Sequence, residues 1–218
     1  MSLFKFCATF VFLSSALLAQ CGISQKDFSG VGHVLVLNSS DWRYATPNQT
    51  VGCLDQNGRF IAPTDDIECG VYTRLDDYPY TLSSTLGNCT FNDAKTVTNK
   101  DSYYGGSDHA WTCNATYEAI IYDELYTIDG FPYVFLCSGD INCYYDAKKI
   151  PGPAETAPLW QFRWGSQQRG ITPGHVQLQL LWTPLNTGKR KSVSDIPSPR
   201  LRLNDGAQIP LQGQEIKS

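Results

Sequence analysis

Few side chains in this sequence have the chemistry that acid–base catalysis requires. The three histidines are His33, His109 and His175. His109 and His175, together with Glu118 and Arg163, could supply the groups of an acid–base catalytic site, provided that the fold brings all four into one cleft. No companion motif surrounds any of them. The sequence alone therefore favours ordinary strand and turn histidines.

Hydrolase motifs that a single sequence can reveal are missing. There is no GxSxG nucleophile elbow, no HExxH zinc helix and no glycine-rich phosphate loop. Neighbouring carboxylates do occur, at Asp65-Asp66, Asp76-Asp77 and Asp123-Glu124. Adjacent residues of a strand point to opposite faces, so such a pair cannot act together across a cleft, and we expect all of them in solvated turns. No catalytic residue, cofactor or metal is specified.

The N-terminus has the pattern of a signal peptide. Lys5 precedes an apolar stretch from Phe6 to Leu18, which is followed by small and polar residues. That stretch is shorter than the roughly 20 residues that span a bilayer. We therefore expect residues 1–21 to be removed and the mature protein to be secreted, with no membrane anchor.

The cysteines fit an oxidising, extracellular environment. Cys7 belongs to the predicted signal peptide, and cleavage after Cys21 leaves six of the eight cysteines, which can all pair. A retained Cys21 bonded to another chain is the alternative. Six cysteines allow fifteen connectivities. The simplest of them pairs neighbours in sequence and gives Cys53–Cys69, Cys89–Cys113 and Cys137–Cys143. No close CxxC pair occurs, so a zinc site is not expected.

Four N-glycosylation sequons follow the predicted signal peptide. They begin at Asn38, Asn48, Asn88 and Asn114. In an exported eukaryotic chain they predict at least one glycan and mark surface positions. Asn88 and Asn114 each adjoin a cysteine, so disulfide formation could compete with their modification.

Composition divides the mature chain near Trp182. Residues 22–182 carry ten Lys and Arg against eighteen Asp and Glu, whereas residues 183–218 carry six against three. The acidic body argues against binding to a nucleic acid, whose phosphates are recognised largely by Lys and Arg. The tail has no aromatic residue and is rich in Pro, Gly and Ser, which predicts disorder. Its Lys189-Arg190 pair is a possible protease site.

The body reads as a succession of short strands. The clearest strand is 175–182, where apolar and polar residues alternate. It predicts a buried set, Val176, Leu178, Leu180 and Trp182, and an exposed set, Gln177 and Gln179. Further strands are expected in 32–37, 132–137, 142–146 and 159–164, with a hairpin loop at 138–141. Residues 116–128 indicate a long or broken strand, and one short helix could lie in 118–124 or 65–69. Many short strands between Gly, Pro and Asn residues predict one all-β domain, an antiparallel sandwich or barrel.

Aromatic residues are numerous and offer a binding chemistry. Most will lie in the core. The pairs Tyr103-Tyr104 and Tyr144-Tyr145 adjoin expected loops, where one ring of each pair could be exposed. Exposed rings suit stacking on a carbohydrate or contact with a protein.

Three cysteine-containing segments carry a family resemblance. Residues 52–70, 87–91 and 108–113, the last with a Trp-x-Cys strand, resemble the small secreted cysteine-rich proteins of filamentous fungi, several of which act as effectors or elicitors on plants. The same pattern is similar, over about a third of the chain, to the β-barrel family of the Alternaria major allergen. Neither resemblance transfers a functional residue. Together they imply a non-enzymatic protein that binds an unknown extracellular protein or carbohydrate of a host or cell wall.

The alternative is a small secreted hydrolase similar to the fungal guanyl-specific ribonucleases. That family is β-rich and disulfide-bonded and uses His, Glu and Arg on one sheet, so the resemblance implies roles for His109, Glu118, Arg163 and His175. The family's local sequence is missing here, apart from the short Tyr78-Pro79-Tyr80. The acidic body would also repel an RNA substrate.

Overall fold

The computed structural model describes residues 23–24, 27–65, 67–138, 143–163, 170–185, 200–202 and 208–210. The predicted signal peptide, the Lys189-Arg190 site and most of the predicted tail lie outside these ranges.

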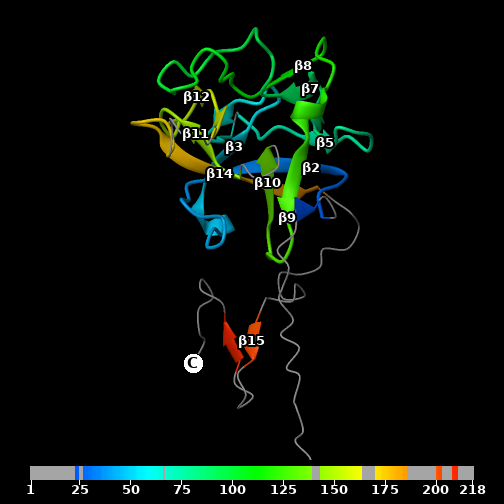
Figure 1. The fold of residues 1–218 in the computed structure, drawn as a ribbon, viewed down its shortest axis with the longest axis vertical. Helices are drawn as coiled ribbons and strands as arrows, with labels where there is room; N and C mark the ends of the chain where they lie inside the picture. The colour runs from blue at the N-terminus through cyan, green and yellow to red at the C-terminus, as the bar shows by residue number, and fades with distance from the viewer. Residues whose placement is uncertain are drawn as a thin grey trace, which may run out of the picture.

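The described body is an antiparallel β structure (Figure 1), as the alternation of apolar residues predicts. Fourteen strands form one curled sheet along the path β1-β9-β10-β14-β2-β5-β6-β7-β8, with the remaining strands attached beside it. Two single-turn 3-10 helices, η1 (Pro47–Gln49) and η2 (Ile121–Asp123), interrupt the strands. The strands of the sheet are β1 (Ile23–Ser24), β2 (Val31–Leu37), β3 (Thr50–Leu54), β4 (Phe60–Ile61), β5 (Tyr72–Arg74), β6 (Leu82–Ser84), β7 (Gly87–Thr90), β8 (Thr112–Asn114), β9 (Leu125–Ile128), β10 (Val134–Ser138), β11 (Tyr145–Ala147), β12 (Thr156–Ala157), β13 (Trp160–Gln161) and β14 (Val176–Pro184).

Strands β2 and β14 form the centre of the sheet, and both of their faces are covered. They pair from Gln179 opposite Leu37 to Pro184 opposite Gly32. One face packs into the main core, which includes Val34, Val36, Leu178, Leu180 and Trp182. The other face packs into a second, smaller core made by Leu37, Ala45, Phe135 and Leu181. Ala45 belongs to the segment 38–49, which therefore lies over the face that a one-sided strand would leave open.

This second core corrects the expected exposure of β14. Leu178, Leu180 and Trp182 are buried as predicted, but Val176 is only half-buried, and Gln179, expected outside, is fully buried. Neither amide atom of Gln179 has a hydrogen-bond partner in the described part of the chain. Gln177 stays partly exposed and donates a hydrogen bond to the Ser40 carbonyl. The alternation of apolar residues predicted the strand itself. The segment 38–49, which covers its second face, lies more than 130 residues away in sequence.

Strands β10 and β11 do not form the expected hairpin. Both pair antiparallel with β14, β10 through Leu136 opposite Leu180 and β11 through Tyr145 opposite Leu178. They therefore run in the same direction along one edge of β14. The chain leaves this line between them and returns, and the Cys137–Cys143 disulfide joins the two ends of the excursion.

The three disulfides of neighbour pairing are confirmed. Cys53–Cys69, Cys89–Cys113 and Cys137–Cys143 have Cα separations of 5.6, 3.9 and 4.0 Å. Cys89 and Cys113 lie directly opposite each other on β7 and β8, so this bridge ties two neighbouring strands. Each bridge shortens the loops available to the unfolded chain, which stabilises a domain of this size by about 2–4 kcal/mol per bridge.

Two expected strands are shorter than predicted. Within 116–128 the strand is broken, as one of the two alternatives allowed: a turn and the short helix η2 come first, and only β9 is a strand. Within 159–164 only β13 is a strand, and Trp164 lies outside the described residues. At the C-terminal end β14 continues past Trp182 to Pro184, and the Leu185 backbone N–H donates to the Val31 carbonyl at 2.7 Å. Farther along, β15 (Arg200–Arg202) pairs with β16 (Gln208–Pro210).

Candidate functional site

A buried polar network joins the segment between β7 and β8 to strands β11 and β14. Figure 1 shows this segment arching beyond the end of the sheet that carries β11 and β12. At its centre, Asp146 of β11 accepts hydrogen bonds from the Thr172 backbone N–H at 3.1 Å and the Asn99 amide at 3.4 Å, and its Oδ1 lies 3.1 Å from Nδ1 of His175. Asn99 also donates to the Thr172 hydroxyl at 2.9 Å.

A tight turn brings His175 to this position. The His175 backbone N–H donates to the Thr172 carbonyl, and Gly174 adopts a φ of 80°, in the left-handed region that glycine accepts without strain. The histidine ring then packs beside Trp160, with 5.5 Å between the ring centroids. The turn and the tryptophan together fix the ring against Asp146.

The outer edge of the network is exposed. Nε2 of His175 lies 3.6 Å from a carboxylate oxygen of Asp101, and Lys148 pairs with the same oxygen at 2.6 Å. Hydrogen bonding to Lys148, helped by that lysine's charge, lowers the pKa of Asp101. The Asp101 and Lys148 side chains are both largely exposed, so this pair contributes little to stability.

Asp108 is a second buried carboxylate beside the first. Burial raises its pKa to about 6; Arg163 opposes this shift and the negative charge of Asp146 adds to it. The Arg163 Nε lies 3.9 Å from Asp108 Oδ1, too far for a hydrogen bond. Asp108 is therefore a buried carboxyl group whose charged form is disfavoured by the loss of hydration.

The network contains the residue types of a catalytic centre, but its acid–base side chains are buried. The side chains of Asp146, His175 and Asp108 have exposed fractions of 2, 3 and 3%. A general acid or base must reach its substrate directly or through one water. Here the buried groups bond to one another and to Asn99 and Thr172 instead. The arrangement fastens the long β7–β8 segment to the sheet, which is a structural role.

The four residues expected for a hydrolase are only partly assembled. Arg163 and His175 belong to the network. His109 follows Asp108 in the chain, and its Nδ1 is buried without a hydrogen-bond partner among the described residues. Glu118 is exposed in the turn between β8 and η2, and no hydrogen bond or ion pair joins it to the network in the described ranges. His33 is a strand histidine whose Nδ1 lies 2.8 Å from the Gly70 carbonyl.

The most exposed apolar run of the described chain lies at η2. Ile120, Ile121 and Tyr122 are consecutive, and 42, 58 and 74% of their surfaces are exposed. We call these three residues the apolar tip. Single exposed apolar residues are ordinary on protein surfaces, whereas three large ones in succession make this run a candidate interaction surface.

A buried carboxylate holds the apolar tip in place. Asp123 accepts hydrogen bonds from the Ile120 backbone N–H at 2.8 Å, the Tyr117 hydroxyl at 2.9 Å and the Asn92 amide at 2.7 Å, and it also bonds the Thr90 hydroxyl. This corrects the expectation that Asp123 lies in a solvated turn, since only 3% of it is exposed. Four donors replace its lost hydration.

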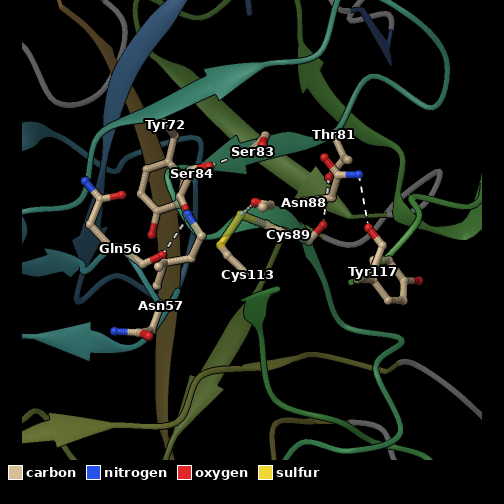
Figure 2. The surroundings of a disulfide bond; sticks show 12 residues. Gln56, Asn57, Tyr72, Thr81, Ser83, Ser84, Asn88, Cys89, Cys113 and Tyr117 are labelled. Carbon is tan, nitrogen blue, oxygen red and sulfur yellow. Dashed lines mark hydrogen bonds between the residues drawn. A yellow bond between two sulfur atoms is a disulfide. The ribbon is translucent and has the colours of Figure 1, made fainter. Parts of the chain in front are cut away.

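Hydrogen bonds through Tyr117 and Asn88 connect Asp123, which holds the apolar tip, to the strands that the Cys89–Cys113 disulfide joins. Figure 2 shows the Asn88 amide pointing at Tyr117, to whose carbonyl it donates at 3.2 Å, beside the Cys89–Cys113 bridge. Asn88 lies on β7, and Tyr117 bonds Asp123 through its hydroxyl. The tip is thus tied to a pair of covalently linked strands and is pre-organised rather than loose.

Acidic residues flank the apolar tip in sequence. Glu118 precedes it and is exposed, and Glu124 follows it and is partly exposed. Tyr78, which is 52% exposed, lies near Glu124: its pKa is raised by desolvation and then by the negative charge of Glu124. Two carboxylates that solvent reaches therefore border the three apolar residues in the chain.

The expected aromatic sites have different outcomes. Tyr103 is 64% exposed and stacks edge-on against Tyr104, as expected for one ring of that pair. Tyr145 is fully buried and donates to the Leu136 carbonyl, and Tyr144 is half-buried. Sequence reasoning missed Tyr122, because it read 116–128 as a long or broken strand and did not ask which of its apolar residues a break would expose. The run of three large apolar residues between Ala119 and Asp123 was the signal that could have revealed the tip.

Comparison with known proteins returns no relative: no family model, curated protein or solved structure matches this chain. No helix among the described residues is long and apolar enough to cross a membrane. Within the same residues, no group of three or more His, Cys, Asp and Glu side chains is arranged to hold a metal ion.

Proposed function

We propose that this chain is a secreted, non-enzymatic protein that binds an extracellular component of a host or cell wall through its apolar tip. The observation that carries the proposal is the tip itself. Three large apolar side chains face solvent on a loop that a buried carboxylate and a disulfide hold rigid. A loop that is ordered before binding loses less conformational entropy when its partner arrives.

Binding is favoured over hydrolysis by the burial of the acid–base residues. Asp146 and His175 pair with each other inside the protein, and the His175 Nε2 is buried without a hydrogen-bond partner among the described residues. Glu118, the carboxylate that a ribonuclease-type centre requires, lies elsewhere on the surface. The proposal of export draws on the three disulfides, because such bonds persist in oxidising compartments. N-glycosylation belongs to the same proposal.

The chemistry of the tip points to a protein partner. Two of its three side chains are aliphatic, and isoleucine fills an apolar pocket better than it stacks on a flat sugar ring. The acidic residues around it favour a pocket bordered by Lys or Arg, because opposite potentials attract across an interface. We therefore propose an extracellular protein with a basic-rimmed apolar pocket, in preference to a polysaccharide.

Site-specific photocross-linking tests the proposal. A photoreactive phenylalanine derivative replaces Tyr122, which is 74% exposed, in one protein and Tyr103, which is 64% exposed on another loop, in the matched control. Both proteins are applied to intact plant tissue and to insoluble chitin, cellulose and β-glucan. We expect a discrete protein adduct from position 122 that is absent from position 103. Equal adducts from both positions, or retention on a polysaccharide that does not depend on position 122, would reject the proposed tip.

A ribonuclease assay tests the alternative on the same material. Purified protein and His175→Ala are incubated with RNA at several pH values. We expect no cleavage above that of buffer. Cleavage by the wild-type protein that His175→Ala abolishes would establish the hydrolase.

A further inference from the structure

We infer that the four sequons divide into two that carry glycans, Asn38 and Asn48, and two that stay unmodified, Asn88 and Asn114. The inference rests on the proposed export, since the transferring enzyme acts only on chains that enter the secretory pathway. The division follows from where the fold places each asparagine amide and the hydroxyl two residues after it.

Asn38 and Asn48 lie together at one exposed corner. The Asn38 backbone N–H donates to the Gln49 carbonyl at 3.0 Å, which closes the base of the segment 38–49. Both asparagines are exposed, and so are the third residues of their sequons, Ser40 and Thr50. In the described part of the chain neither amide takes part in a hydrogen bond. A glycan on either nitrogen extends into solvent.

Asn88 sits in a different setting. It is half-buried on β7, and its Nδ2 faces the Tyr117 carbonyl at 3.2 Å. The hydroxyl of its sequon, on Thr90, is fully buried against Asp123. The residue between them is Cys89, whose disulfide joins β7 to β8. A sugar on Asn88 would press against the turn that leads to the apolar tip.

Both ends of the Asn114 amide are hydrogen-bonded. Its Nδ2 donates to Asp93 at 3.2 Å, and its Oδ1 accepts from the Thr116 backbone N–H and hydroxyl, both at 3.0 Å. It also lies directly opposite Asn88 on the neighbouring strand. Opposite side chains on paired strands are about 5 Å apart at Cβ, so glycans on both would collide.

The transfer step makes the requirement explicit. The asparagine Nδ2 forms a bond to the anomeric carbon of an oligosaccharide that is carried on a lipid diphosphate. The bond from that carbon to the diphosphate oxygen breaks, the lipid diphosphate leaves with the electron pair, and one amide proton passes to a base of the enzyme. The modified nitrogen keeps one N–H and carries a bulky substituent. Asn38 and Asn48 accommodate this product in the folded state, whereas Asn88 and Asn114 do so only by displacing the contacts above.

Enzymatic deglycosylation in ¹⁸O-labelled water reads each site directly. The full chain is secreted from a eukaryotic host, the glycans are removed by a peptide N-glycosidase, and peptides are mapped by mass spectrometry. We expect label at positions 38 and 48 only. Asn38→Gln and Asn48→Gln should each lower the intact mass by one glycan, whereas Asn88→Gln and Asn114→Gln should not. Label at 88 or 114, or a secreted chain without label at 38 and 48, would overturn the inference.

A second version separates this inference from the proposed export. Residues 1–21 are replaced by the host's own signal sequence, so that the chain enters the pathway whatever its own N-terminus does. Label at 38 and 48 in this version, with no secretion of the natural chain, would refute the proposed export and leave the division of the sequons intact.

Discussion

Two buried aspartates organise two regions of this protein in opposite ways. Asp146 contacts His175, the Asn99 amide and the Thr172 backbone N–H, and together they form a polar network in the interior. Asp123 takes a similar set of donors, yet the side chains that it positions, the apolar tip, point outward. The acid–base groups are therefore enclosed in the interior, while large apolar side chains face solvent.

The largest effect is expected from breaking the anchor of the tip. Asp123→Ala leaves donors on Thr90, Asn92 and Tyr117 without their acceptor, and hydrogen bonds to a charged group contribute about 1.5–3 kcal/mol each. We expect the free energy of unfolding, measured in urea, to fall by about 3–5 kcal/mol. The cross-link from position 122 should also be lost in the fraction that stays folded. A loss below about 1 kcal/mol would mean that the carboxylate does not hold the loop.

Removing the partner of the other aspartate should cost somewhat less. His175→Ala leaves Asp146 with its bonds to Thr172 and Asn99, and it opens space beside Trp160. We expect a loss of about 2–3 kcal/mol in unfolding free energy, with tip cross-linking unchanged under native conditions. Reduced cross-linking in a fully folded His175→Ala protein would show that the two regions are coupled, contrary to the comparison drawn here.

The pH dependence of stability distinguishes the polar network from the tip. Because the folded-state pKa of Asp108 is raised from 3.8 to about 6, protonation stabilises the fold: this contribution is complete below about pH 4 and is lost as the pH rises through 6. Asp108→Asn removes the charge. It should raise the unfolding free energy at pH 7.5 by about 1–3 kcal/mol and have little effect at pH 4. The difference between variant and wild type across pH isolates this one group, and a flat difference would contradict the raised pKa.

The smallest effect on stability is expected at the tip itself. Replacing Ile120, Ile121 and Tyr122 by serine removes side chains that are 42, 58 and 74% exposed, so the unfolding free energy should fall by less than about 1 kcal/mol. Binding should nevertheless be lost, because the groups that would enter the partner are gone. Val97→Ser, at a site 59% exposed on another loop, is the control that should keep binding. A large stability loss in the triple variant would mean that the tip packs on the protein.

Some of this architecture was predictable from local patterns. The alternation in β2 and β14 predicted strands, and together with frequent turn residues it predicted the all-β class, because a period of two reports a pleated backbone wherever it occurs. The disulfides followed from short spacing, since neighbouring cysteines need the least loop ordering to meet. These inferences depend on residues close together in the chain.

Tertiary structure decided which surfaces and charges are covered. Gln179 is buried because a segment around Ala45 lies over its face of the sheet. The alternation of residues within β14 could not predict this burial. Asp123 and Glu124 are adjacent and chemically alike, yet Asp123 meets donors from β7, the following loop and the preceding turn, while Glu124 bonds the Tyr126 hydroxyl and stays partly exposed. Burial and hydrogen bonding depend on groups distant in sequence, so a local pattern specifies the strand and the fold specifies what each side chain does.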